Sequence, residues 1–80
     1  MKVQLLRKAN KELFSLNQTD RDRILAKLKT LEQSVFSMDV KKLSKTNYYR
    51  LRVGDYRVIF SIEGTLITVI KIGHRREIYR

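Results

Sequence analysis

Three arginines lie close together in a stretch of alternating polar and apolar residues in the second half of the chain. Arg50 and Arg52 precede a Gly54-Asp55 pair, and Arg57 follows it. A Gly-Asp pair between two such runs is typical of a β-hairpin with a two-residue turn. Because strand side chains alternate between the two faces of a sheet, all three arginines would share one face. Arg52 would lie opposite Arg57, and opposed like charges destabilise a strand pair. We therefore predict a phosphate-binding face, the alternative being an ordinary solvated face.

The C-terminal segment carries further residues that suit phosphate chemistry, namely Arg75, Arg76 and Tyr79. Guanidinium groups bind phosphate, while a tyrosine offers a ring for base stacking and a phenol for proton transfer. Single-stranded RNA is bound by such groups. RNA can also be cleaved by its own 2′-hydroxyl when a protein stabilises the charge on the phosphate oxygens. That reaction requires no metal or other cofactor. On spacing alone, packing at the chain end explains Tyr79 as well as catalysis does.

Composition excludes several other classes of protein. A chain of 80 residues predicts one small domain, residues 1–80. It has no cysteine and a single histidine, which excludes a disulfide scaffold and a thiolate or His-rich metal site. No apolar run is long enough for a membrane span, and the N-terminus does not resemble a signal peptide. We therefore expect a cytoplasmic protein. The net charge of +10 favours nucleic acid or an acidic protein as partner.

The remaining residues must form the elements that position these side chains. Residues 3–6 could form a short strand, and apolar residues at helical spacing predict two helices before residue 36, the second capped by Thr19 or Asp20. Residues 36–47 are predicted to form a basic loop. A second turn at Glu63-Gly64 would complete a three-stranded meander and place Phe60 opposite Ile67. The expected fold is α+β, with an N-terminal strand and a two-helix hairpin packed on an antiparallel β-sheet. The helices would cover the apolar face and leave a concave basic face opposite.

The chain resembles toxins of the RelE/ParE superfamily, and the RelE-like branch in particular. The resemblance rests on Lys42-Leu43, on residues 49–60 (YRLRVGDYRVIF) and on residues 72–80 (IGHRREIYR). It implies the RelE-like (microbial RNase-like) fold and the toxin of a type II toxin–antitoxin system. Such toxins are ribosome-dependent endoribonucleases that cleave mRNA in the A site by 2′-hydroxyl attack and inhibit translation. The implied partners are that mRNA and an acidic RelB-like antitoxin, through which the complex would bind operator DNA.

The resemblance also implies roles for individual residues. The positions that match the family's catalytic residues are Arg50, Arg52, Arg57, Arg75 and Tyr79. Candidate RNA-binding residues are Lys42, Lys45 and Arg76, although surface cations are equally typical of a solvated face. Some members have lysine where this chain has Arg50 and Arg52. Because arginine is not deprotonated in proteins, these two would bind phosphate rather than act as a base. Tyr79 is then the best candidate for proton transfer, followed by His74.

Two other functions are compatible with the same residues. A ParE-type toxin that inhibits gyrase would share the fold and the basic sheet but needs no catalytic tyrosine. Tyr79 and the three sheet arginines argue against it. A non-catalytic module that binds nucleic acid or an acidic protein would need only the charge. Gyrase–DNA adducts or cleaved transcripts after induction would distinguish these functions.

Overall fold

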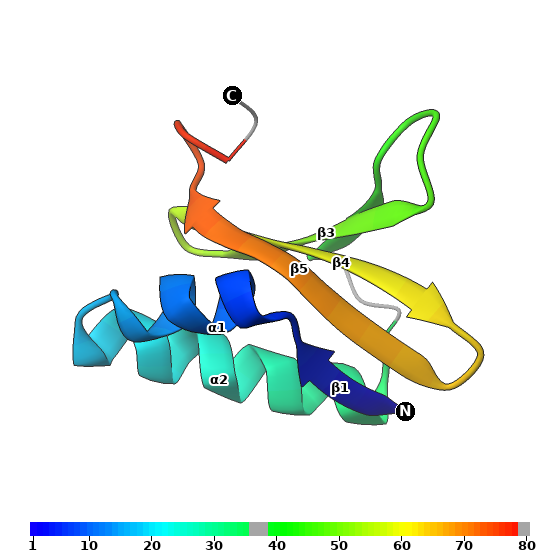
Figure 1. Ribbon diagram of the computed structural model, residues 1–80, viewed down its shortest axis with the longest axis horizontal. Helices are drawn as coiled ribbons and strands as arrows, with labels where there is room; N and C mark the ends of the chain where they lie inside the picture. Colours follow the sequence, from blue (N-terminus) through cyan, green and yellow to red (C-terminus); the bar gives the residue numbers. More distant parts are fainter. Residues whose placement is uncertain (36–38, 79–80) are drawn as a thin grey trace.

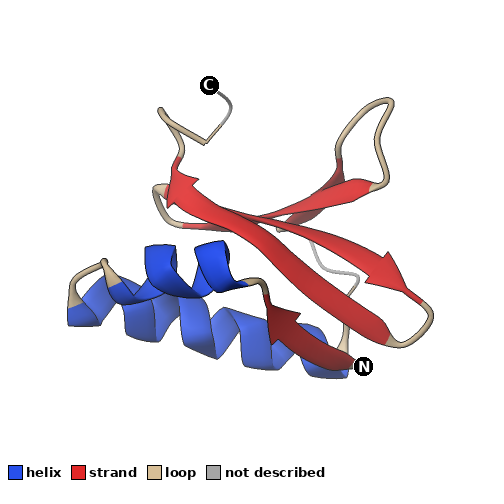
Figure 2. Cartoon of the chain, viewed as in Figure 1, coloured by secondary structure: helices blue, strands red, loops and turns tan. Residues whose placement is uncertain are grey.

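The computed structural model describes residues 1–35 and 39–78. Along the chain the elements are β1 (Lys2–Leu5), α1 (Arg7–Phe14), α2 (Gln18–Gln33), β2 (Val40–Lys42), β3 (Tyr48–Val53), β4 (Tyr56–Glu63) and β5 (Leu66–His74). Within these residues the strands form one five-stranded sheet in the order β1-β5-β4-β3-β2. Both helices lie on the same face of this sheet (Figures 1 and 2). The α+β architecture expected from the sequence is therefore confirmed. We call the side of the sheet away from the helices the outer face.

Two features of the sheet differ from the expectation. β1 pairs with β5 in parallel, with Lys2 opposite Leu66, so the sheet is mixed rather than antiparallel. No turn connects these two strands directly, and their relative direction therefore has no local signal in the sequence. β2 lies in the stretch expected to be a loop and pairs antiparallel with β3. Three residues are too few for the alternation of a strand to be recognised.

The second helix has a different cap from the one expected. Neither Thr19 nor Asp20 caps it, because the helix begins at Gln18 and both residues lie inside its first turn. Asn17 is the N-cap, and its side-chain oxygen accepts a hydrogen bond of 2.9 Å from the backbone N–H of Asp20. The Asn17 side-chain amide also donates to the Asp20 carboxylate. Asparagine is among the best N-cap residues because its short side chain reaches an unpaired amide of the first turn.

The first hairpin has the predicted register. Arg52 lies opposite Arg57, and Val53 lies opposite Tyr56. Gly54 has a φ of +57°, whereas Asp55 is not in the positive-φ region. This is the pattern of a type II′ turn, which needs glycine only at its first central position. Arg50, Arg52 and Arg57 therefore share the outer face, as the alternation of residues 48–60 predicted.

The second hairpin has a different register from the predicted one. Its turn is Gly64-Thr65 rather than Glu63-Gly64, because Gly64, with a φ of +60°, again takes the first central position. Phe60 consequently pairs with Val69 and not with Ile67. An irregularity between Ile59 and Phe60 shifts the pairing once more, so that Arg57 lies opposite Gly73 instead of Ile70. This shift brings the start of the C-terminal segment beside Arg57.

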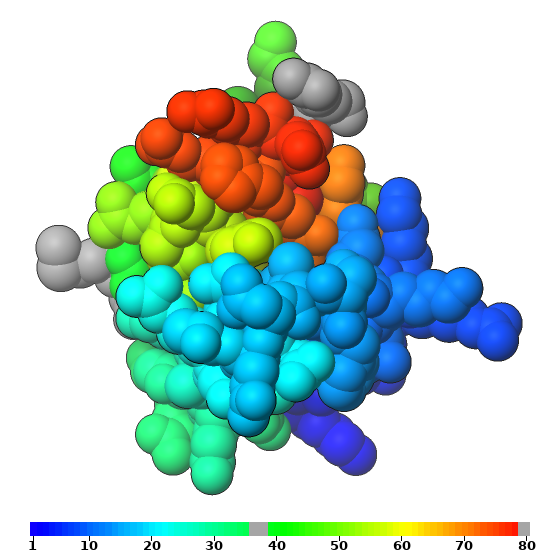
Figure 3. Space-filling model, turned by 90° about the vertical axis from the view of Figure 1, so that its left-hand side faces the viewer, coloured from blue at the N-terminus to red at the C-terminus, as the bar shows by residue number. Residues whose placement is uncertain are grey.

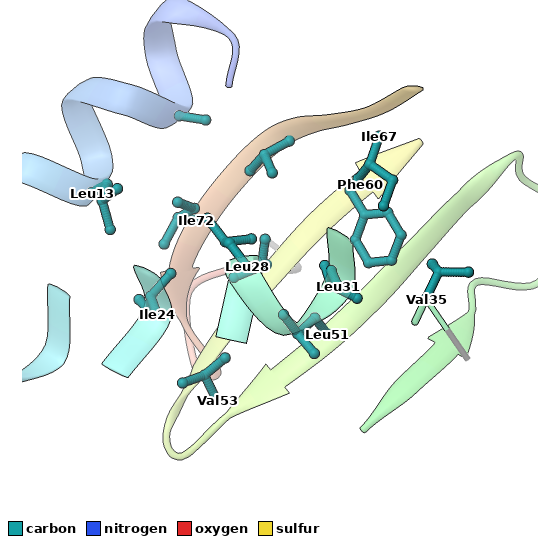
Figure 4. Packing of buried hydrophobic residues seen from close by; sticks show 13 residues of the cluster. Leu13, Ile24, Leu28, Leu31, Val35, Leu51, Val53, Phe60, Ile67 and Ile72 are labelled. Carbon is teal, nitrogen blue, oxygen red and sulfur yellow. The ribbon is translucent and has the colours of Figure 1, made fainter. Parts of the chain in front are cut away.

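The core fills the space between the helices and the sheet (Figure 4). Phe60, Ile24 and Val69 are completely buried there. A smaller apolar contact on the outer face fixes the C-terminal segment. The Ile78 side chain packs so closely over Gly73 that a Cβ at this position would lie only 3.1 Å from the Cδ1 of Ile78. The Nζ of Lys71 also donates to the Ile78 carbonyl at 3.0 Å. Residues 75–78 are thereby held close to the end of β5.

Candidate functional site

An open hollow of about 840 Å³ lies where β3 turns into β4. Its walls come from four parts of the chain: α2, the residue before β2, the first hairpin and the C-terminal segment. Figure 3 shows the start of α2, the hairpin turn and the C-terminal segment meeting on one side of the molecule. Its charged lining residues are Arg23, Lys27, Asp39, Arg52, Asp55, Arg57 and Arg75. Five cationic against two anionic side chains give this basic hollow an excess of three positive charges.

Arg52 is held in the basic hollow by a carboxylate. Its Nη2 lies 3.1 Å from one oxygen of Asp39, and the Nζ of Lys27 lies 3.2 Å from the other. The backbone N–H of Arg52 also donates to the Asp39 carbonyl. The hydrogen bond from Lys27 and then that from Arg52 hold the pKa of Asp39 below its ordinary value. Asp39 thus supplies part of the countercharge that the opposed arginines require.

The Arg57 side chain points toward the hairpin turn and not toward Arg52. Its Nη1 donates to the carbonyl of Gly54 at 2.8 Å and to that of Tyr56 at 2.9 Å. Because Arg52 is bound to Asp39, the two opposed guanidinium groups have separate acceptors. Their repulsion is therefore reduced in the absence of any ligand, and both groups are held in place.

Arg75 reaches the basic hollow from the C-terminal segment. Its backbone N–H donates to the Asp55 carbonyl at 2.7 Å, which ties this segment to the hairpin turn. The Nε lies 3.8 Å from the Asp55 carboxylate, and the side chain is 53% exposed. An exposed pair at that separation is weak. The guanidinium of Arg75 is therefore accessible to an anion that enters the hollow.

The other sequence-predicted residues that the structure describes lie outside the basic hollow. Arg50 is on the outer face, two residues along β3 from Arg52, and its Nε is buried without a hydrogen-bond partner in the part of the chain described here. Lys42 pairs with Tyr49 and so lies on the helix-side face, whereas its neighbour Lys41 pairs with Arg50. The β2 strand that decides this was not foreseen from the sequence.

The candidates in the loop between β2 and β3 and near the chain end do not lie together. Lys45 lies in the loop between β2 and β3 with a φ of 60°. Arg76 is exposed, and its backbone N–H donates to the Nδ1 of His74 at 3.2 Å. The His74 ring packs edge-on against Tyr56 and does not line the basic hollow. Tyr79 lies outside the described residues.

Four charged residues of the basic hollow were not predicted from the sequence: Arg23, Lys27, Asp39 and Asp55, the last expected only as a turn residue. Arg23 and Lys27 are four residues apart and therefore share a face of α2. This spacing was a usable signal, but only the tertiary fold shows that this face borders the hairpin turn. The Arg23 side chain reaches the hairpin turn: its Nη1 would lie 3.6 Å from a Cβ at Gly54. Asp39 is thirteen residues from Arg52 and has no local signal.

The ion pairs of Asp39 predict a pH dependence of stability. Since the folded-state pKa lies below the ordinary value of 3.8, the pairs stabilise the fold above that pH and are lost as the pH falls through the folded-state pKa. We expect Asp39→Asn to be less stable than the parent at neutral pH and equally stable in acid. Urea unfolding of both proteins across this range measures the difference. A difference that is the same at every pH would contradict the role of the carboxylate charge.

No helix among the described residues is long and apolar enough to cross a membrane. Residues 1–35 and 39–78 also contain no group of three or more His, Cys, Asp or Glu side chains arranged to hold a metal ion.

A family model described as the ParE toxin of type II toxin–antitoxin systems matches residues 3–79. The chain belongs to this toxin family. The curated Toxin RelE3 of Methanocaldococcus jannaschii is 42% identical over 43 residues, which are 52% of this chain and 49% of that protein. The match thus spans about half the length of this relative. The RelE-like character expected from the sequence is confirmed by this relative together with the solved structures.

Three solved structures share the fold of the toxin. The RelE–RelB complex of Pyrococcus horikoshii OT3 is 32% identical with a TM-score of 0.83, covering 95% of this chain and 96% of that one. The RelB–RelE complex of Methanococcus jannaschii is 29% identical with a TM-score of 0.78, covering 94% and 93%. The isolated E. coli RelE toxin is 23% identical with a TM-score of 0.78, covering 96% and 88%. At that last level of identity the likeness shows the fold alone.

Proposed function

We propose that this toxin is a metal-independent endoribonuclease that cleaves messenger RNA in the ribosomal A site and so inhibits translation. The observation that carries the proposal is the convergence of Arg52, Arg57 and Arg75 in the basic hollow from β3, β4 and the C-terminal segment. The RelE names of its relatives support the same activity. Action on the ribosome would take place in the cytoplasm.

The proposed reaction is an in-line displacement at phosphorus. The 2′-oxygen of the RNA forms a bond to the adjacent phosphorus as the bond from phosphorus to the 5′-oxygen breaks, which leaves a 2′,3′-cyclic phosphate and a 5′-hydroxyl. One proton leaves the 2′-hydroxyl and one is delivered to the departing 5′-oxygen. Negative charge grows on the phosphate oxygens, and guanidinium groups placed around them stabilise it.

The contacts of the arginines suit this role. Arg52 and Arg57 are bound to Asp39 and to turn carbonyls before any RNA arrives, so their charges need little reorganisation during the reaction. Such preorganised groups are the most effective in stabilising a transition state. Arg75 is more exposed and can move toward the phosphate. Arg50 has a buried Nε without a partner in the described part of the chain and is a fourth candidate ligand.

We propose that the partner of the toxin is an acidic RelB-like antitoxin. Two of the solved relatives were crystallised as complexes with RelB. The net charge of +10 would attract an acidic chain over a long distance. Such a chain could neutralise the toxin by covering the basic hollow. Binding of the complex to operator DNA through the antitoxin is part of the same proposal.

The direct test is induction of the toxin in growing cells, followed by mapping of transcript ends. We expect growth arrest and new ends within translated messages. Intact transcripts would contradict the proposal. Gyrase–DNA adducts with intact RNA would show a ParE-type activity instead, and a harmless protein that still binds RNA would show a non-catalytic module.

Tyr79→Phe tests the proton-transfer role that the resemblance implies. Because the ring is kept and only the phenol is lost, we expect unchanged RNA affinity and cleavage slowed by about 100-fold or more. Single-turnover cleavage of a ribosome-bound message measures the chemical step, and a binding titration measures affinity. Cleavage at the parent rate would show that Tyr79 stacks or packs and does not transfer a proton.

A further inference from the structure

We propose that a second hollow, on the outer face around Tyr48, binds a nucleobase of the same single-stranded RNA whose phosphate enters the basic hollow. This inference rests on the proposed function and adds a base-stacking subsite to it. We call the second site the Tyr48 hollow. Its charged and polar lining residues are Gln4, Lys45, Thr46, Asn47, Tyr48, Ser61, Glu63 and Thr68.

Tyr48 is an aromatic residue that the core does not use. Its neighbour Tyr49 faces the helices and stacks on Phe60, with ring centroids 5.6 Å apart and planes 17° apart. Tyr48 points to the other side of β3 and is 42% exposed. One tyrosine of the pair thus stabilises the fold, whereas the other presents its ring to solvent. An exposed aromatic plane on a strand is the usual platform for a stacked base.

The Tyr48 hollow has the size and lining that a base requires. It encloses about 620 Å³ and combines polar with apolar groups. Ile70 and Leu66 contribute apolar surface, and the side chains of Ser61 and Asn47 can hydrogen-bond to base edges. Gln4 is fixed by a hydrogen bond of 3.0 Å from its amide to the hydroxyl of Thr68.

The loop that carries Tyr48 is held in place before any ligand binds. Leu43 N–H donates to the Tyr48 carbonyl at 2.9 Å, and Tyr48 N–H donates to the Thr46 hydroxyl at 3.1 Å. Lys45, on the rim of the hollow, has the left-handed φ of 60° that side-chain-bearing residues rarely adopt. This loop and the C-terminal segment both rise on the outer side of the sheet (Figure 1). The outer face between them can therefore guide an extended strand.

The residues between the two hollows favour RNA as the occupant. Tyr48, Arg50 and Arg52 are two residues apart along β3 and therefore line up on the outer face. Four residues of strand separate Tyr48 from Arg52 by about 13 Å, a span that a few nucleotides cover. Arg50 lies midway, with a buried Nε that lacks a partner within the described residues. An aromatic plane followed by cations matches the bases and phosphates of a single strand. An acidic peptide would match the cations but not the flat ring.

The first experiment uses a tryptophan as reporter. The chain contains no tryptophan, so Tyr48→Trp introduces a single one. We expect its fluorescence to be quenched by a short 2′-O-methyl RNA, which resists attack by its own 2′-oxygen. The same oligonucleotide with abasic sites should quench far less. Phe14→Trp is the control, because Phe14 is 59% exposed on α1, and its fluorescence should not change. Equal quenching by the abasic oligonucleotide, or none by either, would overturn the proposal.

The second experiment measures affinity for the same 2′-O-methyl RNA. Tyr48→Ala should weaken binding by about 5-fold or more, which corresponds to ~1 kcal/mol of lost stacking. Tyr48→Phe keeps the ring and should bind like the parent. Tyr48→Ala binding at parent affinity, while Arg52→Ala loses affinity, would overturn the base subsite and leave the endoribonuclease proposal intact. That proposal fails by a separate result, growth arrest without cleaved transcripts.

Discussion

Replacing Arg75 with alanine should slow RNA cleavage by about 100- to 1000-fold, the usual loss when one charge-stabilising donor is removed from an active site. Arg75 lines the basic hollow with an exposed side chain whose only ionic contact among the described residues is the long one to Asp55. Its side chain therefore contributes little to the fold, and the variant should unfold at the same temperature as the parent. Single-turnover cleavage in a reconstituted translation system, together with thermal unfolding, measures both effects.

The neighbouring residue provides a matched control. Arg76 carries the same charge and is also exposed, but it does not line the basic hollow. Arg76→Ala should weaken RNA binding slightly through the loss of one distant charge and leave the chemical step unchanged. If both variants lose cleavage equally, the general charge of the C-terminal segment, and not the geometry of the hollow, determines activity.

Replacing Phe60 with alanine should lower the free energy of unfolding by about 3–5 kcal/mol. Phe60 is completely buried, lies opposite Val69 and stacks on Tyr49, so its removal leaves a cavity between the sheet and the helices. A loss of that size is a large part of the ~4–12 kcal/mol typical of a domain of 80 residues. Urea unfolding followed by circular dichroism gives the difference directly.

Phe14→Ala is the control for this loss, because Phe14 is 59% exposed and the guanidinium of Arg21 lies 5.5 Å from the centroid of its ring. Surface changes of this kind usually alter stability by less than ~0.5 kcal/mol. A similar loss in the two variants would contradict the assignment of Phe60 to the core. Toxicity should also fall in Phe60→Ala, since β3 and β4 carry the arginines of the basic hollow.

The first hairpin was predictable from local residues alone. A two-residue turn beginning at Gly54 allows only one pairing, and alternation then decides that Arg50, Arg52 and Arg57 share a face. The second hairpin was predicted two residues out of register. Its glycine could occupy either central position of the turn, and both registers keep Phe60 and Val69 on the apolar side, so the hydrophobic pattern could not choose between them. The irregularity beside Ile59 has no sequence signal either.

The candidate site shows the same division between local and distant contacts. Sequence by itself determined which residues share a strand face or a helix face, because side-chain direction follows from the period of each element. Only the tertiary structure decided that Arg23 and Lys27 of α2 border the hairpin turn and that Asp39 pairs with Arg52. It also moved Gly73 opposite Arg57 and so brought Arg75 to the basic hollow. These contacts join residues far apart in the chain, and they form only when the helices pack against the sheet and the strands take their register.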